Sequence, residues 1–201
     1  MLLVGLTGGL ASGKSLVGQA LAALGCHLIE ADRLGHEVLL PGGEAYEAAV
    51  REFGPGILEM DGTISRRKLA EEVFGKPDRL AALNRLVHPP VIRRQEELTA
   101  GFAAADPRGI VVVEAAILIE TGRHRCFRKV ILAVCRPEQQ IERALRRDEL
   151  SREEVLARLA RQMPLEEKRK YADYIIDTSG AKEETLKQVQ ETYNSLRSIP
   201  Q

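Results

Sequence analysis

A glycine-rich stretch near the start of the chain carries the residue types that bind a phosphate. Residues 8–15 read GGLASGKS, which fits the pattern G-x-x-x-x-G-K-[S/T]. Glycines let backbone N–H groups approach phosphate oxygens closely, Lys14 can reach the β- and γ-phosphates of a nucleotide, and the Ser15 hydroxyl can coordinate Mg²⁺. An apolar run precedes the stretch and an amphipathic pattern follows it. These neighbours favour a phosphate-binding loop (P-loop) over a glycine-rich turn without function.

Acidic residues at the ends of apolar runs could take part in a transfer from such a nucleotide. Asp32 follows the run His27–Ala31, and the carboxyl end of a parallel strand faces the ligand crevice, so Asp32 could accept a proton from an attacking hydroxyl. An N-cap of the next helix is an equally good interpretation. Glu114 follows four apolar residues, as the acid that helps hold Mg²⁺ does in P-loop proteins, but it could equally be a buried, paired strand residue. The spacing gives a weaker indication of function for Glu120 than for Glu114.

Arg143 and Arg147 lie four residues apart on a predicted helix, so they share a face. They could hold a nucleotide phosphate when this segment closes, although most such residues are simply solvated. His88 could bind a substrate phosphate or cap the turn before Pro89. A guanine-selecting N-K-x-D stretch does not follow any predicted strand, which weakens the interpretation as a GTP-dependent switch.

Five continuous apolar runs predict the strands that position these residues. Continuous runs are typical of parallel strands buried on both faces, and helical patterns separate them, so we expect a doubly wound α/β sheet. The first helix should end at Gly25. The five runs are Leu2–Leu6, His27–Ala31, Ile110–Ile119, Lys129–Cys135 and Tyr174–Thr178.

Two long helical segments interrupt the strands. The first, from about Val38 to Ala105, is punctuated by glycine and proline, including His88-Pro89-Pro90, and predicts an inserted subdomain. We therefore expect one domain over residues 1–201, with a core at about 1–37, 106–135 and 172–201, a helical subdomain at about 38–105 and a second helical segment at about 136–171.

The second helical segment contains its own helix signals. Pro137 can start its first helix. Ser151 and Glu154 have the spacing of a capping box, which predicts a second helix start.

The composition is that of a globular protein without a nucleic-acid or membrane partner. Of the 201 residues 44% are hydrophobic, and Lys+Arg and Asp+Glu both number 29, so the basic excess of a general nucleic-acid binder is missing. No apolar run approaches the ~18 residues of a membrane span. The three cysteines, Cys26, Cys126 and Cys135, are widely spaced, so we expect free thiols, the first and last of them buried, in a reducing cytosol.

Five ordered blocks of the chain, from Leu3 to about Gly180, resemble the dephospho-CoA kinase family. They are GLTGGLASGKS, EADRLGHEVL, GTISRRKLAEEVF, LNRLVHPPV and VCRPEQQIERALRRDELSREEVLARLARQMPLEEKRKYADYIIDTSG. The chain differs from the family at EAAILIE, where Pro-Leu-Leu commonly precedes the glutamate, and at DTSG, where Asn often precedes the glycine.

The resemblance implies a P-loop NTPase fold of three α/β/α layers, with a five-stranded parallel sheet, a helical CoA-binding subdomain and a small mobile lid. It also implies ATP-dependent phosphorylation of the ribose 3′-hydroxyl of dephospho-CoA, the last step of coenzyme A synthesis, with Mg²⁺. We expect a cytoplasmic monomer or weak homo-oligomer.

Matching the family's motifs to this chain assigns roles to single residues. The expected catalytic residues are Asp32, Lys14 and Arg143, and the expected substrate-binding residues are Asp32, Arg66, His88 and Glu120. Ser15 should hold the metal, with Glu114 as a possible partner through a water molecule. The expected ATP-binding residues are Gly9, Leu10, Ala11, Ser12, Gly13, Lys14, Ser15, Leu16, Arg143 and Arg147.

Two other functions compete with this one. Another nucleotide or nucleoside kinase would share the core and the lid, and acceptance of a CoA precursor would separate the two. A GTP-dependent switch would prefer GTP to ATP in a binding test.

Overall fold

The computed structural model describes residues 1–148 and 151–200, with the backbone alone at 147 and 148. The chain divides into two compact units, which we call the core unit (Met1–Glu30 and Gly101–Gln201) and the helical unit (Ala31–Ala100). The helical unit overlaps the predicted subdomain at 38–105 but begins at Ala31. Asp32 therefore belongs to the helical unit.

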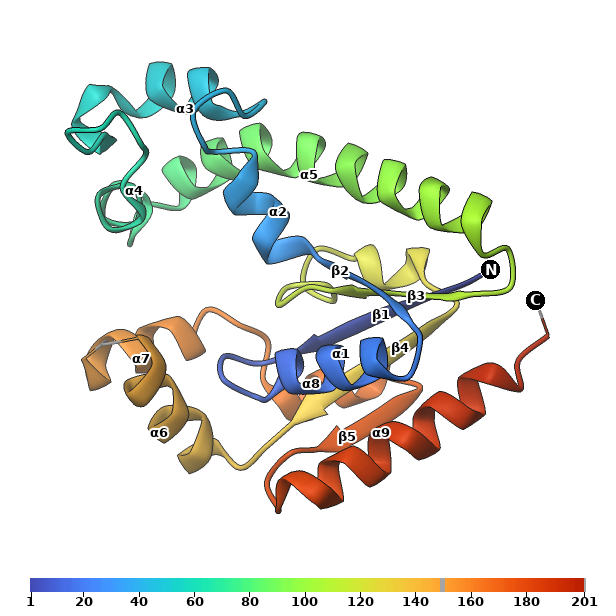
Figure 1. Cartoon of the computed structure of the whole chain (residues 1–201). Helices are drawn as coiled ribbons and strands as arrows, with labels where there is room; N and C mark the ends of the chain where they lie inside the picture. Colours follow the sequence, from blue (N-terminus) through green and yellow to red (C-terminus); the bar gives the residue numbers. More distant parts are fainter. Residues whose placement is uncertain (149–150, 201) are drawn as a thin grey trace. The chain divides into compact units, whose positions relative to one another are not determined.

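The core unit is built on a five-stranded parallel sheet with the strand order β2-β3-β1-β4-β5 (Figure 1). All five residues of β3 are buried, as expected for a strand that is covered on both faces. The predicted parallel sheet is confirmed. Its strands are β1 (Leu2–Gly8), β2 (His27–Glu30), β3 (Ile110–Glu114), β4 (Lys129–Val134) and β5 (Tyr174–Asp177).

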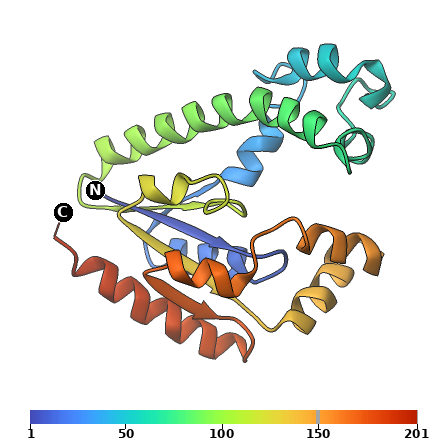
Figure 2. The same cartoon turned by 180° about the vertical axis from the view of Figure 1, so that it is seen from behind.

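Helices cover the sheet on both sides, which makes three layers. On one side, α1 (Lys14–Ala23) and α9 (Lys182–Arg197) bury Leu21 and Val189 in the main hydrophobic core. On the other side, a Cβ atom added to Gly5 would lie 2.6 Å from the Leu118 side chain, so the segment after β3 packs against the sheet there. Helix α1 lies in front of the strands in Figure 1 and behind them in Figure 2.

The segment at 136–171, which the resemblance implies to be a lid, lies within the core unit. Pro137 is the first residue of its first helix. The capping box is also confirmed: Ser151 Oγ accepts the Glu154 N–H at 3.2 Å, and Glu154 Oε2 accepts the Ser151 N–H at 2.8 Å. The segment contains α6 (Pro137–Asp148), α7 (Arg152–Leu159), α8 (Leu165–Lys168) and the 3₁₀ helix η3 (Arg169–Tyr171).

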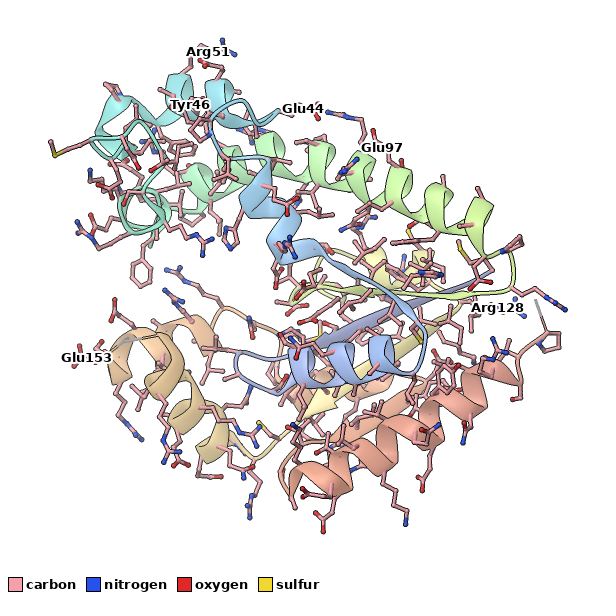
Figure 3. All side chains as sticks on the ribbon, viewed as in Figure 1. Glu44, Tyr46, Arg51, Glu97, Arg128 and Glu153 are labelled. Carbon is pink, nitrogen blue, oxygen red and sulfur yellow. The ribbon has the colours of Figure 1, made fainter. Side chains whose placement is uncertain are left out.

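The helical unit has a small hydrophobic core of its own, made by Phe53, Ile57 and Leu69 with their neighbours. Polar contacts fix its loops: the Tyr46 hydroxyl donates to the Gly62 carbonyl at 2.5 Å, and Glu44 forms an ion pair with Arg93 (Figure 3). Its elements are α2 (Ala31–Glu37), α3 (Tyr46–Phe53), the 3₁₀ helix η1 (Pro55–Ile57), α4 (Arg66–Val73) and α5 (Pro77–Ala105), which continues into the core unit.

The predicted end of the third strand is wrong. The apolar run continues to Ile119, but β3 stops at Glu114. The next residue, Ala115, donates its N–H to the Leu6 carbonyl, and the chain then turns. Leu118 and Ile119 are buried in the turn that follows, so their apolar character serves packing rather than strand pairing.

The proline pair does not interrupt the helical unit as expected. Pro89 and Pro90 lie inside the continuous helix α5, although a proline lacks the N–H that helix hydrogen bonding needs. Pro90 and Val91 are buried. Packing of this helix therefore outweighs the local preference of the prolines to end it.

The three cysteines are free thiols. Cys26 and Cys135 are buried as predicted, and Cys126 is exposed. Burial raises the pKa of Cys26 to about 11 and also raises the pKa of Cys135. Among the helices that the structure describes, none has the length and apolar character to cross a membrane.

Candidate active site

The glycine-rich stretch joins β1 to α1, which confirms the predicted strand–loop–helix arrangement. Gly13 caps α1 with a φ of 86°, and Ala11 has a φ of 54°. Gly8 has no room for a side chain, because an added Cβ atom would lie 2.7 Å from the Ala133 carbonyl oxygen. The N-terminus of α1, with its unsatisfied N–H groups and partial positive charge, therefore opens onto the loop as an anion-binding site.

Lys14 and Ser15 occupy the first turn of α1, beside the end of β3. Lys14 Nζ donates to the Gly9 carbonyl at 3.2 Å, which folds the side chain over the loop. Ser15 Oγ donates to Glu114 Oε1 at 3.0 Å. Glu114 is buried at the carboxyl end of β3, next to β1 in the sheet. The structure thus brings together the three residues that the sequence singled out for phosphate and metal.

The Ser15–Glu114 corner has the right chemistry for Mg²⁺, which prefers oxygen ligands and usually keeps several waters. Its donors are one hydroxyl and one carboxylate, and an added Cβ atom on Gly18 would lie 2.8 Å from Glu114 Oε2, so the carboxylate faces α1. Among the residues with a described structure, no three His, Cys, Asp or Glu side chains gather into a metal site. Phosphate oxygens and water are the other ligands that Mg²⁺ usually takes in nucleotide sites.

Arg143 on α6 is half-buried and bonded to the residue that follows β5. Its Nη1 donates to Thr178 Oγ1 at 2.9 Å and its Nη2 to the Thr178 carbonyl at 2.7 Å. Thr178 Oγ1 in turn donates to the Ser12 carbonyl at 3.0 Å. Thr178 thus links the positively charged Arg143 to Ser12 of the P-loop, so Arg143 is not simply a solvated residue. The side chain of Arg147 lies outside the described part of the structure.

Two glutamines from the lid hold the P-loop at Leu10. Gln140 Nε2 donates to the Leu10 carbonyl at 2.8 Å, and Gln162 Oε1 accepts the Leu10 N–H at 2.8 Å. No motif in the sequence singles out either glutamine. Their only signal is their place in the predicted lid, because a polar residue on a helix ordinarily faces water.

Glu120 lies in the turn after β3, where it pairs with Lys168 of α8 at 2.9 Å. The same oxygen, Oε1, accepts the Met163 N–H at 3.1 Å. The structure thus joins Glu120 to the lid, while its expected contact with the acceptor substrate stays a prediction.

Asp32 lies in the first turn of α2 and is exposed. The helix begins at Ala31, one residue earlier, so Asp32 is neither the last residue of a strand nor an N-cap. A carboxylate in a first turn is still favourable because it faces the positive end of the helix dipole. Asp32 is two residues beyond Glu30, the last residue of β2. Glu30 is paired with Glu114 in the register of β2 and β3.

In the helical unit, the charges of two predicted acceptor-binding residues, Asp32 and Arg66, act on His36. Partial burial and the positive charge of Arg66 lower the pKa of His36, whereas the Asp32 carboxylate raises it, so both charges act on this imidazole. His88 lies on α5 next to Val87, whose side chain an added Cβ atom on Gly35 of α2 would meet at 3.9 Å. No motif in the sequence singles out His36, although it lies four residues after Asp32 on the same helix face.

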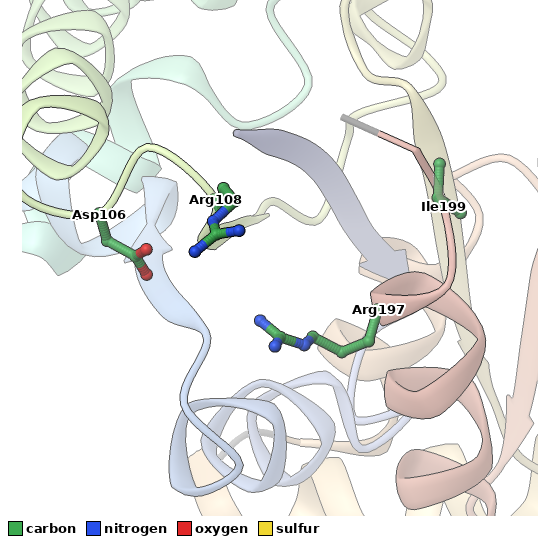
Figure 4. Close-up of a pocket in the computed structure, with 4 residues that line it drawn as sticks. All are labelled: Asp106, Arg108, Arg197 and Ile199. Carbon is green, nitrogen blue, oxygen red and sulfur yellow. The ribbon is translucent and has the colours of Figure 1, made fainter.

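The core unit also has a hollow of about 540 Å³, which is separate from the P-loop. It is lined by Asp106, Arg108, Arg197 and Ile199 (Figure 4). Arg108 lies just before β3 and Arg197 ends α9, so the hollow is at the amino edge of the sheet. The P-loop and Glu114 are at the carboxyl edge, where folds of this class bind ligands.

Comparisons with known proteins identify the family to which the chain belongs. A family model described as dephospho-CoA kinase matches residues 2–184. A dephospho-CoA kinase of Aquifex aeolicus is 39% identical over 197 residues, 98% of each protein. Among solved structures, a Thermus thermophilus protein matches with a TM-score of 0.84 at 33% identity, and a dephospho-CoA kinase from Campylobacter jejuni with 0.61 at 26%, each over 96% of both chains. The chain with this P-loop, parallel sheet and lid belongs to the dephospho-CoA kinase family.

Proposed function

We propose that the chain transfers the γ-phosphoryl group of ATP to the ribose 3′-hydroxyl of dephospho-CoA, giving CoA and ADP. This is the ATP-dependent phosphorylation that completes coenzyme A synthesis. The main structural support is the P-loop of the core unit, with Lys14 at the start of α1 and Ser15 bonded to Glu114 at 3.0 Å. The 3′-oxygen bonds to the γ-phosphorus, the bond from that phosphorus to the β–γ bridging oxygen breaks, and the hydroxyl proton leaves to a base.

The ATP side of the reaction needs groups that stabilise a developing negative charge. The loop N–H groups and the Lys14 ammonium hold the β- and γ-phosphates, and Arg143 adds a second cation beside the loop. Mg²⁺, held by Ser15 directly and by Glu114 through a water molecule, would neutralise charge on the β- and γ-phosphate oxygens.

The acceptor side needs a base and groups that hold the CoA precursor. Asp32 takes the proton of the 3′-hydroxyl and fixes its line of attack. Arg66 and His88 bind phosphate groups of the acceptor, and Glu120 contributes a polar contact. The electrostatic effect of both Asp32 and Arg66 on His36 supports a common site for these two residues within the helical unit.

We also infer that the protein works in the cytosol as a monomer or weak oligomer. Three free cysteines, one of them exposed, fit a reducing compartment better than an oxidising one.

Incubation with ATP, Mg²⁺ and dephospho-CoA tests the function directly. We expect the acceptor to gain the mass of one phosphate group, with fragmentation placing it on the ribose. Adenosine and AMP serve as comparison acceptors, because a general nucleoside or nucleotide kinase would phosphorylate one of them as efficiently. Phosphorylation of either compound with dephospho-CoA left unchanged would contradict the proposal.

Replacing Arg143 with alanine should lower kcat about ten- to a hundredfold, since a hydrogen bond to a charged group is typically worth ~1.5–3 kcal/mol. The KM for dephospho-CoA should change far less, because Arg143 belongs to the core unit with the P-loop. Steady-state kinetics with each substrate varied in turn measures both quantities.

Arg146→Ala on the same helix is the matched control. Arg146 is exposed and pairs with Glu142 at 2.7 Å, so its loss removes a positive charge from α6 without touching Thr178. Equal kinetics for the two alanine variants would show that Arg143 only holds Thr178 in place.

A further inference from the structure

Lys168 at the end of α8 is a completely buried lysine, with 0% of its side chain exposed. Burying an ammonium group is costly unless a counter-charge and hydrogen bonds compensate for lost water. Here each of its three N–H bonds has an acceptor: the Gly8 carbonyl at 3.3 Å, the Ala116 carbonyl at 2.9 Å and the Glu120 carboxylate at 2.9 Å. The structure compensates this charge fully, which makes its position specific.

These acceptors belong to the segments that form the ATP site. Gly8 is the last residue of β1 and the first glycine of the P-loop. Ala116 lies two residues beyond Glu114, the carboxylate that accepts from Ser15. Strands β1 and β3 are neighbours in the sheet. One ammonium group therefore joins the carboxyl ends of the strand that carries the phosphate loop and the strand that carries the metal-side carboxylate.

The same connection extends into the lid. Glu120 Oε1, the partner of Lys168, also accepts the Met163 N–H at 3.1 Å. The preceding residue, Gln162, accepts the Leu10 N–H of the P-loop at 2.8 Å. The segment from 162 to 168 thus contacts the P-loop at two places, near its start and at Leu10.

We propose that Lys168 is a positioning residue for the phosphates of ATP: it sets the P-loop against the end of β3 and ties both to the lid. The inference rests on the proposed function and adds a residue to it. Lys168 is fully buried, so it acts through Gly8, Ala116 and Glu120 rather than by touching a substrate.

The rival explanation is an ion pair that only stabilises the fold. The two explanations separate when both charges are removed together, because a buried ion pair can often be replaced by neutral groups without loss of stability. Lys168→Met alone leaves the half-buried Glu120 carboxylate without its counter-charge and should lower the melting temperature. The double variant Lys168→Met/Glu120→Gln removes that imbalance and keeps an amide oxygen for the Met163 N–H.

The decisive measurement is ATP binding by the double variant in the absence of dephospho-CoA. We expect a melting temperature near that of the wild type and a Kd for ATP that is raised about tenfold or more, since small displacements of positioning groups have large effects. Glu120→Gln alone should show a smaller increase, and Lys170→Met, which changes an exposed lysine two residues away, should show none.

A double variant with wild-type stability and a Kd for ATP within twofold of the wild type would overturn the proposal and leave a purely structural ion pair. Because the binding assay contains no acceptor, this outcome is distinct from failure of the proposed function. That function would fail through unchanged dephospho-CoA in the wild-type reaction, whatever the double variant does.

Discussion

The variant Lys14→Ala should fold normally and lose about 10²–10³ in kcat, the range measured when one preorganised group that stabilises transition-state charge is removed. Lys14 is the first residue of α1, and alanine is an excellent helix former, so the helix itself should not suffer. The loop N–H groups and the end of the helix remain, so ATP should still bind. The missing charge matters most while negative charge on the γ-phosphoryl group is being redistributed.

The exposed Lys187 of α9 provides the control for this experiment. Lys187→Ala removes the same charge from the core unit at a distance from the loop in sequence and should leave kcat unchanged. Melting curves, ATP binding and steady-state rates are compared for the two variants. If folded Lys14→Ala retains more than about a third of the wild-type kcat, the expected electrostatic contribution is absent and the P-loop lysine has no part in the transfer.

The P-loop and the parallel sheet could be predicted because their signals are local. In the pattern from Gly8 to Ser15, glycines occupy positions that have no room for a side chain, and the start of a helix follows directly. Continuous apolar runs mark strands that are buried on both faces. The same kind of signal failed after Glu114. A run of apolar residues does not distinguish a strand from a buried turn, and residues 115–119 are buried or half-buried in a turn except for the exposed Ile117.

The lid contacts could not be predicted, because each joins residues that are far apart in the chain. Gln140 and Gln162 meet Leu10 across 130 and 152 positions, and Lys168 meets Gly8 across 160. Composition and spacing describe such residues as ordinary members of polar helices. Only the folded sheet, which carries β1 beside β4 and β4 beside β5, brings them to the loop.

The sequence alone leaves two roles open for Asp32, a base and a helix cap, and the structure changes that choice. Asp32 lies within the first turn of α2, so its structural contribution is a charge near the positive end of the helix rather than a capping bond. An asparagine keeps the shape of the side chain and removes both the charge and the capacity to accept a proton. The variant Asp32→Asn therefore still separates structure from chemistry, with a stability cost of about 0.3–1 kcal/mol.

We expect Asp32→Asn to lower kcat by roughly 10²–10⁴, the usual contribution of a general base, while ATP binding is unchanged. Glu47→Gln is the matched control, because Glu47 is an exposed carboxylate in the first turn of α3 in the same unit. It should lose the same small amount of stability and keep full activity. The His36 imidazole gives an independent readout: Asp32 raises its pKa, so His36 should titrate at a lower pH in Asp32→Asn, which NMR measures directly. If the variant shows the shifted His36 titration and an undiminished kcat, the charge of Asp32 has been removed from a folded enzyme without effect on the transfer. The base would then have to be another group.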